Sequence, residues 1–101
     1  MPFVPEENPM VWVVVQTLEG AEQYVGQHIP DQDIRFIPFS QEKEDAQYGL
    51  SLMPRQKGSR YEIQAIRFRE LARDAARQGF LLFRTDGEGQ ILDKIDPHTV
   101  A

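Results

Sequence analysis

The segment from Tyr61 to Phe83 constrains the fold of this chain most strongly, because it predicts a strand, a helix and a strand with almost no spacer. Its first part, Tyr61–Phe68, alternates apolar and polar residues as a half-buried strand does. The next stretch, from about Arg67 to Gln78, predicts a helix, and Gly79 occupies the position of a left-handed C-cap. The apolar residues of this helix fall on one face: Phe68, Leu71, Ala72 and Ala75. We therefore expect this segment to form the centre of the core.

Two further strands are predicted after this helix. Phe80–Phe83 is a continuous apolar run, typical of a short buried strand. Thr85–Gly89 predicts a hairpin turn, because the Asp86–Gly87 pair supplies the positive backbone torsions that a tight turn requires. Gln90–Ile95 then predicts the closing strand of this hairpin.

Three strands are also predicted in the N-terminal half. Met10–Gln16 is apolar on both faces and therefore predicts an interior strand. Glu22–Ile29 predicts its hairpin partner, although a short helix from Ala21 to Gln27 is an alternative that the sequence leaves open. Ile34–Phe39 predicts a third strand, and Pro38 places the end of that strand near an edge or a bend.

A second helix is predicted between the third and fourth strands, from about Gln41 to Leu52. Ser40 is well placed as its N-cap, and acidic residues follow in the first turn, where they favour the positive end of the helix dipole. Pro54 ends the helix, and Arg55–Arg60 is expected to be an exposed basic loop. The apolar stripe of this helix is thin: Ala46, Leu50 and Met53.

These elements predict one α+β domain. The expected order is strand, strand, strand, helix, strand, helix, strand, strand. We expect a mainly antiparallel sheet of about five to six strands, with both helices packed on one face and a parallel pairing wherever a helix crosses over. The chain of 101 residues has the usual size of one domain, which we assign to residues 10–96. Residues 1–9 are expected to be a loose, disordered arm, residues 97–101 a tail, and Met10 an alternative translation start.

The composition favours a cytoplasmic protein without a membrane segment. The chain has no cysteine, which excludes disulfides, a thiolate zinc site and a thiol nucleophile. The N-terminal residues are acidic and rich in proline where a signal peptide would be basic. The apolar run at Met10–Val15 is far shorter than the roughly 20 residues that a spanning helix needs.

No residue pattern in the sequence predicts catalysis, a metal or a cofactor. Ser40 is expected to cap a helix, Ser51 to lie within that helix and Ser59 in a mobile loop, so none is placed as a nucleophile beside His28 or His98. The acidic run Glu42–Asp45 lies in one helical turn, where adjacent carboxylates point in different directions. His28 is expected to be a half-exposed strand residue, and Lys57–Ser59 lacks the glycine spacing of a phosphate-binding loop.

The distribution of charge is the main indication of function. Residues 1–50 contain nine acidic and two basic residues, whereas residues 51–101 contain seven acidic and nine basic ones, although the whole chain has a net charge of −5. The basic residues concentrate in one loop and on one face of the helix at residues 67–78. We expect them to form one positive patch that contacts a partner or an anion: Arg55, Lys57, Arg60, Arg69, Arg73 and Arg77.

Three functional hypotheses follow. The leading one is a non-enzymatic protein-interaction module of unknown partner, with a homodimer as one form of contact, because Tyr24–Ile29 is a strand without obvious charged edge protection. The second is binding of nucleic acid or another polyanion through Arg55–Arg77, which the acidic net charge disfavours. The third is a small-ligand receptor or an enzyme whose site is assembled from residues distant in sequence. The alternative without a binding role is that the arginines form a solvated helix face, with Glu70 paired to Arg73 and Asp74 to Arg77.

Overall fold

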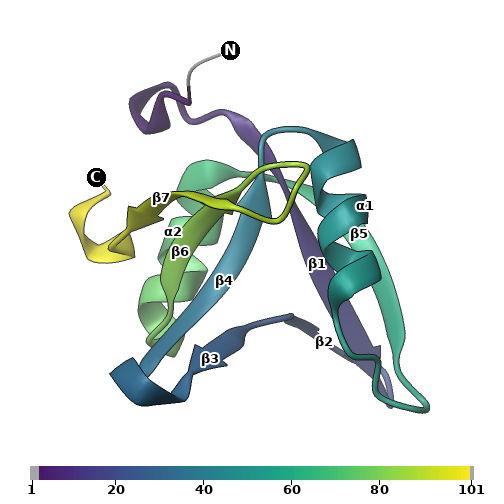
Figure 1. The fold of residues 1–101 in the computed structure, drawn as a ribbon. Helices are drawn as coiled ribbons and strands as arrows, with labels where there is room; N and C mark the ends of the chain where they lie inside the picture. Colours follow the sequence, from purple (N-terminus) through teal and green to yellow (C-terminus); the bar gives the residue numbers. More distant parts are fainter. Residues whose placement is uncertain (1–2, 101) are drawn as a thin grey trace.

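The computed structural model describes residues 3–100 and shows an α+β fold built on one seven-stranded sheet (Figure 1). The predicted class and the predicted order of strands and helices are confirmed, and the sheet has slightly more strands than expected because the second predicted strand is divided in two. The elements are β1 (Met10–Leu18), β2 (Ala21–Tyr24), β3 (Gln27–Ile29), β4 (Ile34–Ser40), α1 (Lys43–Leu52), β5 (Arg60–Arg67), α2 (Phe68–Gln78), β6 (Leu81–Thr85) and β7 (Ile91–Ile95). Three short 3-10 turns complete the order: η1 (Pro5–Glu7), η2 (Pro30–Gln32) and η3 (Pro97–Thr99).

The sheet is mainly antiparallel, and β1 lies at its centre. β5 pairs with β1 along one side, while β2 and β4 pair with different parts of the other side. β1 and β4 diverge below their short contact, and β2 and β3 lie across the space between them (Figure 1). Among residues 3–100, one pairing is parallel and joins β4 to β6, because two helices and β5 separate these strands along the chain. Pro38 does not lie at an edge: it is paired with Phe83 of β6 on one side, and on the other side it lies where β4 changes its neighbour from β3 to β1.

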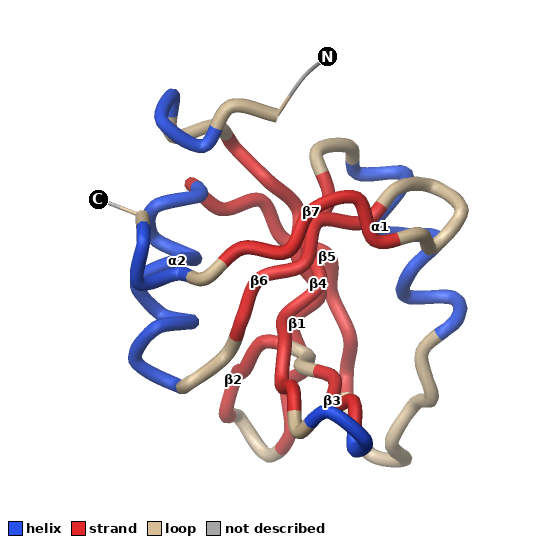
Figure 2. Tube along the Cα trace, turned by 60° about the vertical axis from the view of Figure 1, so that its left-hand side comes forward, coloured by secondary structure: helices blue, strands red, loops and turns tan. Residues whose placement is uncertain are grey.

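The two helices lie on opposite faces of the sheet, as Figure 2 shows, whereas the sequence predicts that both cover one face. α2 packs on the face formed by alternate residues of β1, and its apolar stripe is almost completely buried. α1 lies over the other face, where Lys43 approaches the ring of Trp12. The helices lie on opposite faces because β1 is apolar on both sides, so each face of the sheet must be covered. The main core consists of Val11, Val13, Val15, Ile37, Phe39, Phe68, Leu71, Ala72, Ala75 and Leu82.

Ser40 does not cap α1. It is the last residue of β4, is buried, and its hydroxyl lies 3.1 Å from the hydroxyl of Thr85 on β6. α1 begins two residues later than predicted, with Glu42 at its N-cap and no side-chain hydrogen bond at that position. The strand pairing of β4 therefore extends through Ser40, and it overrides the local capping preference of serine.

The turns are confirmed in place, but one differs in its chemistry. Gly79 ends α2 in the left-handed conformation, with φ of 79°. In the β6–β7 hairpin the left-handed residue is Gly89 instead of Gly87, and the Asp86 carboxylate accepts hydrogen bonds from the backbone N–H groups of Glu88 and Gln90. The side chain of Asp86 thus closes a wider turn than the predicted tight one.

The segments that flank the sheet pack against α2. The ring of Phe3 lies 5.1 Å from that of Phe68, and the Asn8 side chain accepts a hydrogen bond from the N–H of Arg69 in the first turn of α2. At the other end Pro97 is buried and Val100 packs against the core. The described parts of the expected arm and tail therefore contact the domain, and Met1, Pro2 and Ala101 lie outside the described residues.

Candidate functional site

Three of the predicted contact residues lie together on the exposed face of α2. Arg69, Arg73 and Arg77 recur at every fourth position, and their side chains point away from the buried stripe of the helix. With 1.5 Å of rise per residue, this spacing sets successive arginines about 6 Å apart along the helix axis. The guanidinium group of Arg69 donates a hydrogen bond to the backbone carbonyl of Glu6, which orients one end of the row.

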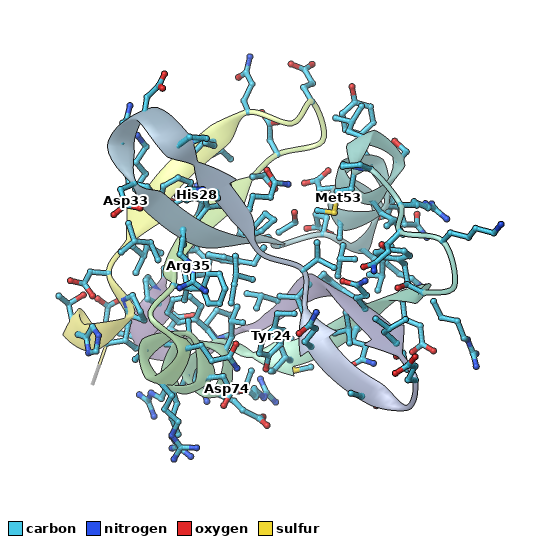
Figure 3. All side chains as sticks on the ribbon, turned by 90° about the horizontal axis from the view of Figure 1, so that it is seen from below. Tyr24, His28, Asp33, Arg35, Met53 and Asp74 are labelled. Carbon is cyan, nitrogen blue, oxygen red and sulfur yellow. The ribbon has the colours of Figure 1, made fainter. Side chains whose placement is uncertain are left out.

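The ion pairs that would neutralise this row do not form within residues 3–100. No carboxylate lies within 4.0 Å of the guanidinium groups of Arg73 or Arg77 in this range. Asp74 instead accepts a hydrogen bond of 2.5 Å from the hydroxyl of Tyr24 on β2 (Figure 3). Burial raises the pKa of the Tyr24 phenol well above its usual range, and the hydrogen bond and charge of Asp74 raise it further. The partner of Asp74 is therefore a tyrosine, and the predicted Asp74–Arg77 pair is wrong.

The arginine row forms one wall of a depression that we name the α2–η3 groove. Its volume is about 500 Å³, and η3 forms the opposite wall. His98 contributes an imidazole to the wall formed by η3. It is a polar lining residue of the groove that the sequence did not indicate. The lining residues are Arg69, Ala72, Arg73, Ala76, Arg77, Pro97, His98 and Val100.

The other three predicted residues lie elsewhere, so the structure does not form one continuous patch. Arg55 and Lys57 belong to the loop between α1 and β5, on the opposite side of the sheet from α2, and Arg60 is the first residue of β5 (Figure 2). The guanidinium of Arg55 lies 5.8 Å from the ring centroid of Tyr61, and Arg60 is 4.0 Å from Glu62. The row of arginines and the basic loop are therefore separate surfaces.

A larger cleft, which the sequence did not indicate, lies on the face covered by α1. It has a volume of about 660 Å³, and we name it the α1-face cleft. In Figure 3 His28 and Met53 mark two of its sides. Its lining comes from nearly every element of the N-terminal two thirds and from the β6–β7 hairpin: Gln16, Val25, Gly26, Gln27, His28, Phe36, Pro38, Gly49, Leu52, Met53, Pro54, Gln56, Tyr61, Thr85, Gly89 and Ile91.

Comparisons with known proteins do not assign either surface. No family model matches the chain, and no curated protein or solved structure matches it. Among residues 3–100, no helix is long and apolar enough to cross a membrane. The same part of the chain contains no group of three or more histidine, aspartate or glutamate side chains arranged to hold a metal ion.

Proposed function

We propose that this protein is a non-enzymatic binding module that holds an extended acidic segment of a partner protein in the α2–η3 groove. The observation that carries the proposal is the row of arginines without carboxylate partners along one wall of this groove. Guanidinium groups that no carboxylate neutralises are suited to bind carboxylates, because each presents several N–H donors in a fixed planar fork.

The spacing of the arginines favours an extended ligand. Successive members of the row lie about 6 Å apart, and side chains on one face of an extended strand recur at about 6.6 Å. Acidic residues at alternate positions of an extended segment would therefore meet Arg69, Arg73 and Arg77 in turn. The small, partly exposed side chain of Ala76 leaves room for the backbone of such a segment between the walls.

A protein ligand is favoured over a nucleic acid for two reasons. The chain has a net charge of −5, which opposes the approach of a long polyanion. The described lining of the groove contains no phenylalanine, tyrosine or tryptophan, whereas single-stranded nucleic acids are commonly bound by stacking on such rings. A cytoplasmic location belongs to this proposal and is supported by the complete absence of cysteine.

Fluorescence anisotropy with a labelled, capped peptide that alternates glutamate and serine tests this function. The double variant Arg73→Glu/Arg77→Glu should bind the peptide at least about tenfold more weakly, because two exposed ion pairs of up to about 1 kcal/mol each become repulsive. The matched control is Arg55→Glu/Lys57→Glu, which makes the same change of charge on the other side of the sheet. The control should bind as the wild type does, and affinity should fall as salt is raised.

Three outcomes would contradict the proposal. The first is no salt-sensitive binding of the acidic peptide by the wild-type protein. The second is equal weakening by the groove variant and the loop variant, which would show a non-specific effect of charge. The third is binding of single-stranded nucleic acid that exceeds peptide binding and is lost in the groove variant, which would assign the groove to polyanions of that class.

A further inference from the structure

We propose that the α1-face cleft is a second binding site, which takes a mainly apolar segment of a partner protein. The observation that leads to this proposal is the absence of any lysine, arginine, aspartate or glutamate among its described lining residues. Charged residues make up 27% of the chain, so a charge-free surface that contains sixteen lining positions is unusual for this protein. The site lies across the sheet from the α2–η3 groove and does not depend on it.

The floor of the cleft is built and held in place. Phe36 and Pro38 line the cleft, and the ring of Phe36 stacks on the buried ring of Phe83 at 4.2 Å between centroids. The Gln16 amide donates hydrogen bonds to the Gln56 side chain, at 3.0 Å, and to the Ser59 hydroxyl, at 2.8 Å. These bonds fix the α1–β5 loop against β1, so the cleft exists before a ligand enters. Its volume of about 660 Å³ falls within the usual range of ligand sites, about 300–1,000 Å³.

The rim identifies the occupant as a protein segment. Three large side chains at the mouth are exposed in the free molecule: Tyr48 by 43%, Leu52 by 62% and Ile91 by 43%. Tyr48 and Leu52 both lie close to Gly89 of the β6–β7 hairpin, which lines the cleft together with Leu52 and Ile91. A small molecule inside the cleft would leave these side chains in water. A polypeptide that crosses the rim would cover them and fill the cleft in the same contact.

The charges beside the cleft indicate how that segment is oriented. Arg55 lies over the ring of Tyr61, which lines the cleft, and Lys57 is exposed in the same loop. A segment with an acidic residue at the end next to this loop would add charge complementarity to the apolar contact. The expected sequence signature is therefore a short apolar run with aspartate or glutamate at one end.

Selection from a random peptide library displayed on phage tests the proposal. The wild-type protein should enrich peptides that carry an apolar run with an acidic residue at one end. The enriched peptides should bind the rim variant Leu52→Gln/Ile91→Thr at least about tenfold more weakly, since it removes exposed apolar area without a change of charge. The matched control is Met10→Gln/Leu92→Thr, which removes exposed apolar side chains that do not line the cleft and should bind these peptides as the wild type does. Failure of the acidic peptide to bind the groove would leave these expectations unchanged.

Each contrary result overturns the proposal. No enrichment, or enriched peptides that bind the rim variant and the wild type equally, would show that the cleft is not their site. A concentration-dependent dimer in sedimentation equilibrium that dissociates in the rim variant would assign the cleft to a second copy of this chain. Binding of the neutral dye Nile red that no enriched peptide displaces would assign it to small apolar molecules. Equal unfolding midpoints of the rim variant and the wild type should confirm that the substitutions leave the fold intact.

Discussion

The hydrogen bond between Tyr24 and Asp74 joins β2 to α2, and we predict that the Tyr24→Phe substitution exposes its contribution through the pH dependence of stability. The bond measures 2.5 Å between the Tyr24 hydroxyl and the Asp74 carboxylate. Burial is the main cause that raises the pKa of Tyr24, followed by the Asp74 hydrogen bond and the charges of Asp74 and Glu70. Phenylalanine keeps the ring and removes only the hydroxyl, so the packing of the site should be retained.

The sign of the effect follows from proton linkage. The pKa of Tyr24 is raised in the folded state above its unfolded value of about 10, so the folded state holds this proton more tightly. The resulting stability is fully present below about pH 10 and is lost as the pH rises above it. If Tyr24 stayed fully protonated in the folded state, the free energy of unfolding would fall by about 1.4 kcal/mol by about pH 11. Tyr24 is only partly buried, and solvent screening reduces this loss to about 1 kcal/mol.

Urea unfolding from about pH 8 to about pH 11 measures this effect. Near neutral pH the free energy of unfolding of Tyr24→Phe should be about 1 kcal/mol below that of the wild type, the low end for a hydrogen bond to a charged group. The difference should shrink to near zero at about pH 11, because only the wild type loses stability through this residue. Tyr48→Phe is the control for the general effect of removing a tyrosine hydroxyl, since Tyr48 is 43% exposed. A difference for Tyr24→Phe that stays constant with pH would refute the reasoning.

Three further predictions concern the packing of the sheet. Leu71→Asp should abolish the cooperative unfolding transition, because it places a charge at a fully buried position; a transition at the wild-type midpoint would contradict this. Phe3→Ala should lower the free energy of unfolding by about 2 kcal/mol, roughly half the cost at a fully buried site, and no change would show that residues 3–9 do not stabilise the domain. Gly26→Ala should lower the free energy of unfolding in urea by about 1–3 kcal/mol, because the added Cβ would lie 2.6 Å from the Phe80 ring. In the double variant with Phe80→Leu the loss should be smaller than the sum of the two single losses, and additive losses would argue against the contact.

The sequence predicted the elements well where one local signal was sufficient. α2 has an apolar stripe and a glycine stop, and β1 is apolar on both faces, so both elements lie where expected. The predicted placement of both helices on one face of the sheet was wrong. The face that a helix covers depends on the packing between helix and strands, and a thin apolar stripe such as that of α1 does not specify it. Ser40 shows the same limit, since its strand partner lies far away in sequence.

The candidate sites divide in the same way. The arginine row on α2 could be predicted, because positions four apart on a helix always share a face. Its opposite wall could not, because only the tertiary packing of η3 brings His98 beside α2. The sequence also predicted that this row and the basic loop form one patch. That prediction is wrong, because β5 crosses the sheet between the loop and α2. The α1-face cleft is assembled from segments distant in sequence, and no single segment shows it.

The position at which the acidic peptide binds shows whether the α2–η3 groove is a binding site. Amide chemical shifts of the ¹⁵N-labelled protein, followed during titration with the peptide that alternates glutamate and serine, give this location. We expect saturable shifts at residues 69–77 and 98–100, on the two walls of the α2–η3 groove, and none at residues 55–60. Saturable shifts confined to residues 55–60, or no saturable shifts at all, would contradict it.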